Sequence, residues 1–470
     1  MTNRSRRRWR LYVLSICLPF VFLAIIDLGL RAAGIEAPED PLLFHLRTHD
    51  LNFSPFVDGA EGFVSIRPDW ISRGDALRET RGTREGRYFL YPGFRPSRFQ
   101  RNKEAGAIRI FALGGSSTFG LHAGQNHAFA ALLGTRLGQV LPNRRVEMIN
   151  LGCPGWASGH VRNVLDAVLE LDPDLLIIYC GHNEMLEGHV VSRPKLGWLG
   201  WVRATLISNS TLAGWLNHAI TARSRARWLE MVSEETAALE AGRIPTYDPQ
   251  GLPDDQQRRP DQHFFDMAAA RFAANLEAMI DRTHTAAVPV IFVLPVRNLL
   301  LPPSISAYDQ DAARANERAS LVRRAQQMLT QGRVEDGLNL LDAATELSPD
   351  HAKTRYLRGT ALMRLGRRPE AESDLRMACD LDVRTHRITS QLEDALIGAV
   401  KGSNGTWIDL RPQFQGDLNV ASAKKLFFDH VHPTRSGHRI IARRLLPRVL
   451  DDLEINGAAA AAVGVEAGRP

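Results

Sequence analysis

Short apolar runs alternate with longer amphipathic stretches from residue 108 onward, and this alternation leaves few folds open to the chain. Four runs are short, mostly apolar and rich in β-branched residues, as parallel strands buried on both faces are. The runs cover 108–113, 146–151, 175–179 and 288–294, and the helical stretches between them cover 128–139, 160–171 and 265–285. Strands that alternate with helices in this way predict an α/β fold with a doubly wound parallel sheet.

A 34-residue period interrupts the alternation over residues 318–383. Five pairs recur at that spacing: Ala325 and Gly359, Gly332 and Gly366, Leu341 and Leu375, Ala344 and Ala378, and Leu347 and Leu381. The period, with Pro349 where a second helix would end, resembles the tetratricopeptide repeat. Because each repeat buries its apolar face on a neighbour, we expect the helical patterns near 305–317 and 386–400 to cap the pair.

The amino terminus has the features of a membrane anchor. Five arginines and no acid occupy residues 1–10, and the 20 residues from 11 to 30 carry a single charge, Asp27. A helix of that length spans about 30 Å, the thickness of a bilayer core. Because basic residues stay on the cytoplasmic side, we expect a signal anchor over 11–33 and a periplasmic body at the inner membrane. A cleaved signal peptide is the alternative, although Arg31 makes the following Ala32-Ala33 a poor cleavage site.

The formal net charge of +6 does not indicate a nucleic-acid partner. Without the five arginines of residues 1–10, 53 basic residues stand against 52 acidic ones in the rest of the chain. A nucleic-acid-binding protein gathers basic side chains along its docking face, and the body of this chain has no such run. The charge therefore reports topology rather than a polyanionic partner.

The four cysteines do not form the framework of a disulfide-rich secreted protein. Cys17 lies in the expected anchor, which leaves Cys153, Cys180 and Cys379 as an odd number outside it. We expect three buried thiols, the common state of free cysteine, with one Cys153–Cys180 bridge as the alternative.

Four short blocks carry residues with catalytic chemistry, and each lies after a strand or beside the last helix. They are Gly114-Gly115-Ser116-Ser117-Thr118, Asn150-Leu151-Gly152-Cys153-Pro154-Gly155, Gly181-His182-Asn183-Glu184 and Asp429-His430-Val431-His432. Ligands of open α/β sheets bind outside the carboxyl ends of the strands, so we expect the blocks to converge on one rim.

In order and spacing the four blocks resemble those of the SGNH (GDSL-type) hydrolase superfamily. The resemblance covers about 108–183, 288–298 and 405–450, and it implies a flavodoxin-like sheet and an ester hydrolase without a cofactor. Ser116 matches the nucleophile of that family, although Gly115 stands where its signature has an aspartate. Asp429 and His432 match the Asp-x-x-His pair that completes its triad.

These residue types suit the cleavage of an ester. Ser116 would attack the carbonyl carbon while His432 takes its proton and Asp429 stabilises the imidazolium. The resemblance assigns the oxyanion hole to the backbone N–H groups of Ser116 and Gly155 and to the side-chain amide of Asn183. Each such donor stabilises a transition state by about 3 kcal/mol.

The residues that flank these catalytic positions each have two alternative roles. His182, Glu184 and His430 either contact the substrate or support the site, and Asn298 either lines the site or closes a turn. A metal site of His182, His430 and His432 is a further alternative, but no additional ligand has a recognisable spacing, and we expect no metal.

Three functions are consistent with these features. The first is a membrane-anchored serine esterase that acts on the acyl ester of a lipid or glycan. The second is an acyltransferase that passes the acyl group, such as acetyl, from Ser116 to an envelope glycan. In the third, the repeats make the chain an envelope scaffold that docks a protein partner, although the complete Ser/Gly/Asn/Asp/His set favours catalysis.

The chain divides accordingly into seven segments. They are a basic tail (1–10), the anchor (11–33), an irregular segment with a few edge strands (34–105), the first part of the hydrolase (106–304, with an insertion at 186–262), the helical insert (305–400), the second part of the hydrolase (401–455) and a disordered tail (456–470).

Overall fold

The computed structural model describes residues 22–35, 55–58, 62–66, 97–185, 210–216, 219–220, 262–304, 306–307, 311–383, 387–403 and 405–454. It contains two compact units, residues 1–53 with 193–242 and residues 54–192 with 243–470. Residues 1–21, most of 186–262 and the tail 456–470 lie outside the described residues, and with them Cys17 and much of the predicted anchor. The seven predicted segments therefore stay a prediction.

A five-stranded parallel sheet forms the core of the larger unit. Its strands are β4 (Ile108–Gly114), β5 (Val146–Gly152), β6 (Leu175–Tyr179), β7 (Val290–Leu294) and β8 (Thr406–Asp409), in the order β5-β4-β6-β7-β8. The register places Gly114 beside both Gly152 and Tyr179, so three strands end together. The predicted parallel α/β sheet is confirmed, and β8 adds an edge strand to the four predicted ones.

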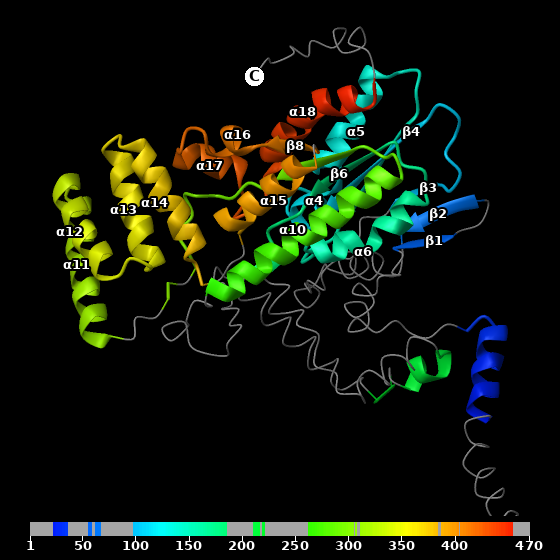
Figure 1. Ribbon diagram of the computed structural model, residues 1–470, viewed down its shortest axis with the longest axis horizontal. Coiled ribbons are helices and arrows are strands. Elements are labelled where there is room, and N and C mark those ends of the chain that lie inside the picture. Colours follow the sequence, from blue (N-terminus) through cyan, green and yellow to red (C-terminus); the bar gives the residue numbers. More distant parts are fainter. Residues whose placement is uncertain are drawn as a thin grey trace, which may run out of the picture. The chain divides into compact units, whose positions relative to one another are not determined.

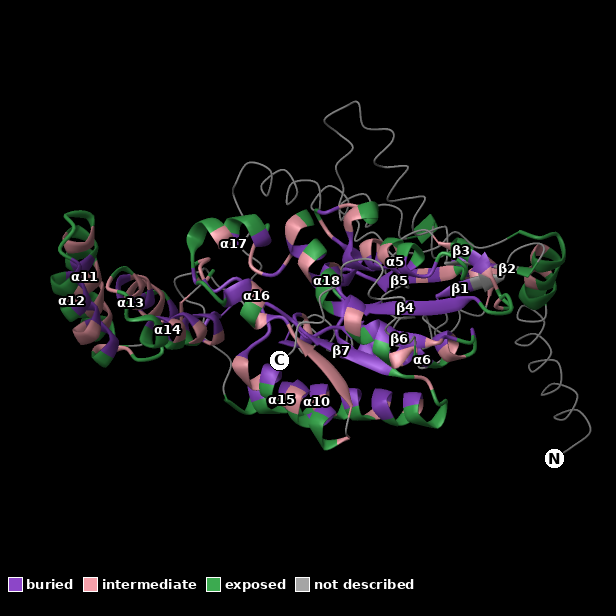
Figure 2. Cartoon of the chain, turned by 90° about the horizontal axis from the view of Figure 1, so that it is seen from above, coloured by how far each residue is buried: buried purple, intermediate pink, exposed green. Residues whose placement is uncertain are grey.

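Helices cover both faces of this sheet, and the central strands are buried between them (Figure 2). On one face, α5 (Phe129–Val140) packs against α18 (Arg435–Asp452). On the other face, α10 (Gln262–Thr285) packs against α6 (Ser158–Leu169) and α15 (Ser390–Gly402). The helix predicted near 386–400 as a cap for the repeats also covers the sheet, because α15 contacts β7 and β8.

Short elements connect these layers. They are α4 (Ser116–Phe119), the 3-10 turn η2 (Gln125–His127), α16 (Arg411–Gln415) and α17 (Val420–Leu426).

Two helix pairs lie between β7 and α15, as the 34-residue period predicts. They are α11 (Ala312–Thr330) with α12 (Val334–Leu347) and α13 (Ala352–Arg364) with α14 (Arg368–Asp380), and Figure 1 shows them side by side. Glycine allows the close contact within each pair, because a Cβ at Gly337 would lie 2.9 Å from Leu329 and one at Gly359 would lie 2.8 Å from Leu375. The assignment to the tetratricopeptide repeat stays a prediction.

A small antiparallel sheet packs on the amino-terminal side of the large one. It consists of β1 (Phe56–Asp58), β2 (Phe63–Ile66) and β3 (Arg98–Gln100). The fully buried Arg109 of β4 ties the two sheets together, because it pairs with Glu147 at 2.7 Å and donates to the backbone carbonyls of Gln100 and Arg101. A buried guanidinium needs such partners to offset its lost hydration.

The described part of the smaller unit is helical over residues 22–32 and 211–216. Asp27 accepts hydrogen bonds from the hydroxyl of Ser210 (3.0 Å) and the backbone N–H of Leu212 (2.9 Å), and it pairs with Arg31. Among the residues that the structure describes, no helix has the length and apolar character needed to cross a membrane.

The described cysteines Cys153, Cys180 and Cys379 are buried free thiols, as expected, and no Cys153–Cys180 bridge forms. Burial raises the pKa of the Cys153 thiol well above its ordinary value, which keeps it protonated and unreactive.

Candidate active site

Ser116 begins α4 directly after β4, on a turn that only glycine can make. Gly114 has φ of +155°, and a Cβ there would lie 2.0 Å from the carbonyl oxygen of Tyr179. A Cβ at Gly152 would lie 2.1 Å from the backbone nitrogen of Phe119. The two glycines therefore let α4 fit between the ends of β5 and β6, which places Ser116 at the carboxyl edge of the sheet.

Three side chains form a continuous hydrogen-bonded line at this edge. Nε2 of His432 lies 2.7 Å from Oγ of Ser116, and Nδ1 of His432 lies 2.6 Å from Oδ2 of Asp429. Both distances are within the range of direct hydrogen bonds, so one imidazole joins a hydroxyl to a carboxylate. The structure thus brings together the three residues that the sequence singled out as a triad.

The loop that carries Asp429 and His432 is held by its own backbone. The second carboxylate oxygen, Oδ1 of Asp429, accepts the N–H groups of Val431 and His432, each at 2.9 Å. Burial raises the pKa of this carboxyl, but the bond to His432 and the two backbone donors outweigh it and hold the pKa well below its usual range. Asp429 is therefore ionised at neutral pH and faces the imidazole.

Asn183 lies beside the nucleophile turn. Its Nδ2 donates to the carbonyl oxygen of Trp156 at 2.9 Å, and a Cβ built on Gly115 would lie 3.0 Å from this Nδ2. An amide has two N–H groups, so the bond to Trp156 orients the side chain and leaves the other N–H for an incoming oxygen. Gly155, in the exposed turn before Trp156, has φ of +82°.

Glu184 and Asn298, whose roles the sequence left open, support the site. The fully buried Glu184 accepts the backbone N–H of Ser158 (2.9 Å) and its hydroxyl (2.7 Å), which fixes the start of α6 just after the Gly155 turn. Asn298 closes a turn by accepting from Leu300, and it also donates to the carbonyl of Asp429 at 3.3 Å.

The two flanking histidines are neutral. Burial lowers the pKa of His182 to about 3 and that of His430 to about 4. Nδ1 of His182 accepts the backbone N–H of Ile388 at 3.2 Å, and Nε2 of His430 lies 3.3 Å from the carbonyl oxygen of Pro302. Both rings are therefore engaged by the protein backbone.

His122 is a site residue that the sequence did not reveal. Its Nε2 lies 4.0 Å from Oδ2 of Asp429, and its ring stacks on the exposed Phe428 with centroids 4.1 Å apart. Burial and the charge of His432 lower its pKa, so the ring is largely neutral. His122 lies in a turn shortly after Ser116, with φ of +65°.

In the described part of the chain, one group of side chains has the spacing of metal ligands. It consists of His122, Asp429 and His432, whose ligating atoms lie within 4.8 Å of one another. This group shares only His432 with the predicted metal alternative. His432 is already bonded to both Asp429 and Ser116, an arrangement suited to proton transfer.

A Gly115→Ala variant tests the contact between the nucleophile turn and Asn183. The added Cβ would lie 3.0 Å from both Nδ2 of Asn183 and the carbonyl of Trp156, so the amide must move. We expect kcat for p-nitrophenyl acetate to fall about 10- to 100-fold, since a misplaced group in an active site costs about that much. Gly138→Ala on α5, where a Cβ meets nothing within 4 Å, is the control and keeps its activity. Full activity of a folded Gly115→Ala enzyme would contradict the role of this contact.

Comparison with known proteins identifies the family. The model of the GDSL-like lipase/acylhydrolase family matches residues 112–361, more than half of the chain, and this range contains Ser116, Gly155 and Asn183. A search of curated proteins gives no match.

Several solved structures are similar to the chain at low identity. LAE5, an alpha/beta hydrolase enzyme from the metagenome of Lake Arreo, is 13% identical with a TM-score of 0.34, over 74% of this chain and 96% of that one. A variant of Axe2, an acetyl xylan esterase from Geobacillus stearothermophilus, is 12% identical with a TM-score of 0.35, over 78% and 99%. The esterase EstA from Pseudoalteromonas sp. is 11% identical with a TM-score of 0.33, over 74% and 98%. With its parallel sheet and its match to the family model, the chain belongs to the GDSL-like lipase/acylhydrolase family and is an ester-hydrolysing enzyme.

Proposed function

We propose that the protein is a serine esterase in which Ser116, His432 and Asp429 form the catalytic triad. The observation that carries this proposal is the unbroken line of hydrogen bonds from Oγ of Ser116 through both imidazole nitrogens to the Asp429 carboxylate, at 2.7 and 2.6 Å. The acceptor carboxylate fixes the ring proton on Nδ1, so Nε2 is free to accept the proton of the serine.

In the first half of the reaction, Oγ of Ser116 attacks the ester carbonyl while Nε2 of His432 takes its proton. The developing imidazolium is stabilised by Asp429, whose pKa is held well below its usual range. His432 then gives the proton to the departing alcohol, which leaves an acyl group on Ser116. In the second half, water attacks the acyl-enzyme while Nε2 of His432 takes its proton. His432 then returns the proton to Oγ of Ser116 as the carboxylic acid leaves.

The negative charge of the tetrahedral intermediate needs donors that are in place before the reaction. The proposal assigns this task to the backbone N–H groups of Ser116 and Gly155 and to the second N–H of Asn183. The bond from Asn183 to Trp156 supports this role, because it orients the amide in advance. No free energy is then spent on reorienting the amide when charge develops beside it.

Labelling with a fluorophosphonate tests the assignment of the nucleophile. We expect one label per folded chain, located by mass spectrometry in the tryptic peptide of residues 110–136, which contains Ser116. Heat-denatured protein is the control and should not react, because the hydroxyl is activated only beside His432. A folded protein that takes up no label would contradict the esterase mechanism.

Transfer of the acyl group to a glycan, in place of water, uses the same residues and acyl-enzyme. An acyl ester offered with and without an oligosaccharide acceptor separates the two outcomes. Hydrolysis at the same rate with no acylated sugar is the result that this proposal expects, whereas acylated sugar would make the enzyme a transferase.

We also propose that residues 11–33 anchor the protein in the inner membrane and that the catalytic unit is periplasmic. The arginines of residues 1–10 support this orientation, and Phe22, Ile25 and Leu28 support an apolar environment because they are 61–66% exposed. A reporter that is active only in the periplasm, fused after residue 40, should be active. Activity of a cytoplasm-specific reporter at the same position would overturn the proposed orientation.

A further inference from the structure

Arg387 and Ile388, which precede α15, lie between two parts of the active site. Their exposed fractions are 2% and 0%. A charged side chain this deeply buried must make specific polar contacts, and those of Arg387 lead to the site.

Arg387 reaches the loop that carries Asp429 and His432 through one intermediate residue. Its Nη1 donates to the carbonyl oxygen of Asn298 at 3.0 Å. The backbone N–H of Asn298 in turn donates to the carbonyl of His430 at 2.9 Å, and its side chain donates to the carbonyl of Asp429. Two hydrogen-bond steps therefore separate Arg387 from the catalytic loop.

Ile388 contacts the block that carries Asn183. Its N–H donates to Nδ1 of His182, the residue before Asn183, so the neutral ring holds its own proton on Nε2. A Cβ built on Gly181 would lie 3.0 Å from Cδ1 of Ile388, which shows how closely the isoleucine packs on this block. The dipeptide thus contacts the Asn183 block directly and the Asp429–His432 loop through Asn298.

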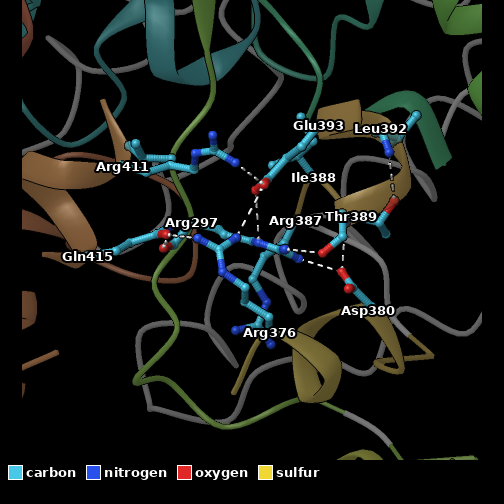
Figure 3. A network of polar contacts seen from close by, with 12 residues as sticks. Arg297, Arg376, Asp380, Arg387, Ile388, Thr389, Leu392, Glu393, Arg411 and Gln415 are labelled. Carbon is cyan, nitrogen blue, oxygen red and sulfur yellow. Dashed lines mark hydrogen bonds and ion pairs between the residues drawn. The ribbon is translucent and has the colours of Figure 1, made fainter. Parts of the chain in front are cut away.

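Buried ion pairs fasten this dipeptide to the end of the helix pairs. Nη2 of Arg387 donates to Asp382 at 3.0 Å, and Asp382 is 1% exposed. In parallel, the fully buried Arg297 binds Asp380 at the end of α14 and Glu393 of α15, and Figure 3 shows it between these two carboxylates. The geometry of the site is therefore tied to the position of α14.

We infer that Arg387 is a positioning residue that sets the spacing between the Asp429–His432 loop and the Asn183 block. This inference rests on the proposed roles of Asp429, His432 and Asn183. The guanidinium is suited to this task because its rigid fork binds Asp382 with one nitrogen and two carbonyls, those of Asn298 and Leu301, with another.

Arg387→Lys is the first test, since it keeps a charge for Asp382 but cannot reach both carbonyls. We expect kcat for p-nitrophenyl acetate to fall about 10- to 100-fold with KM within about threefold, because a misplaced catalytic group costs about this much. Arg358→Met is the matched control. It removes a guanidinium that pairs with Asp342 and Asp374 inside the helix pairs, and it keeps the wild-type kcat.

A double-mutant cycle separates positioning from general stability. In the double variant Arg387→Lys/Asn183→Ala, the loss of kcat should be at least about fivefold smaller than the product of the two single losses. The reason is that both residues act on the same geometry. Arg358→Met and Asn183→Ala should combine without coupling. Should Arg387→Lys fail to fold, the variant Asp382→Leu/Arg387→Met removes both charges, leaves neither buried alone and replaces it in the cycle.

Three results would overturn the inference: a folded Arg387 variant with the wild-type kcat, an equal loss in Arg358→Met, or independent effects in the cycle. None of them touches the esterase proposal, which fails only if the wild-type enzyme takes up no fluorophosphonate. Loss of folding in both Arg387 variants would also count against the inference about Arg387, since the residue would then be needed for the fold as a whole.

Discussion

Replacing Ser116 with alanine is expected to abolish labelling by a fluorophosphonate and to lower kcat by about 10⁴- to 10⁶-fold. The alanine removes the atom that would become acylated, and it leaves His432 without a hydroxyl to deprotonate. Substrate binding and the melting temperature should change little, because Ser116 is only half-buried and its hydroxyl bonds to His432. Labelling stoichiometry and the initial rate of ester hydrolysis measure the two effects.

The neighbouring serine provides the control for this experiment. Ser117 follows Ser116 directly, but its hydroxyl is buried and donates to the carbonyl of Val431 at 3.3 Å. Ser117→Ala should therefore still take up one label per chain. Label retained by Ser116→Ala and lost by Ser117→Ala would move the nucleophile by one position.

Asp429→Asn is expected to lower kcat by about 10⁴-fold while the fold stays intact. The amide oxygen can still accept the N–H groups of Val431 and His432, which now bond to Oδ1 of Asp429. The NH₂ group then faces Nδ1 of His432, which must become an acceptor, so the ring proton moves to Nε2 and points at Ser116. The imidazole can no longer act as a base, and pre-steady-state acylation should slow by the same factor as kcat.

The charge of Asp429 can be tested directly. Because its pKa is held below the usual range, the carboxylate is present throughout that range and is lost only as the pH falls below it. The infrared difference between the wild-type enzyme and Asp429→Asn should therefore contain the carboxylate band of Asp429 at both about pH 5 and about pH 7. Loss of that band at the lower pH would mean that Asp429 is protonated there. Asp417→Asn, which changes an exposed carboxylate of a nearby turn, should leave the activity unchanged.

The sheet could be predicted where local sequence decides the structure. The runs that form β4 and β6 are buried along their whole length, and such runs have little alternative to a central strand. β8 escapes prediction because it has four half-buried residues, Thr406-Trp407-Ile408-Asp409, too few to show a period. It exists as a strand because β7 offers it an edge, a contact that no local pattern reports.

The candidate site could likewise be predicted only in part, where local sequence decides the position of a residue. Ser116, Gly155 and Asn183 could be placed because each follows a strand, and the carboxyl ends of parallel strands meet. His122 could not, since its place beside Asp429 arises only when the carboxyl-terminal loop docks. The supporting roles of Glu184 and His182 depend likewise on α6 and on the segment before α15, which are distant in the chain.

Ser116 and His432 lie 316 positions apart in the chain, which has a consequence for the life of the protein in the cell. The serine is made early, but its base arrives with one of the last loops, ahead of the helix that closes the sheet domain. With the proposed triad, a chain that is still being synthesised therefore carries an ordinary, unreactive hydroxyl. A copy truncated before His432 would lack the base beside Ser116 and could not use this hydroxyl to cleave an ester.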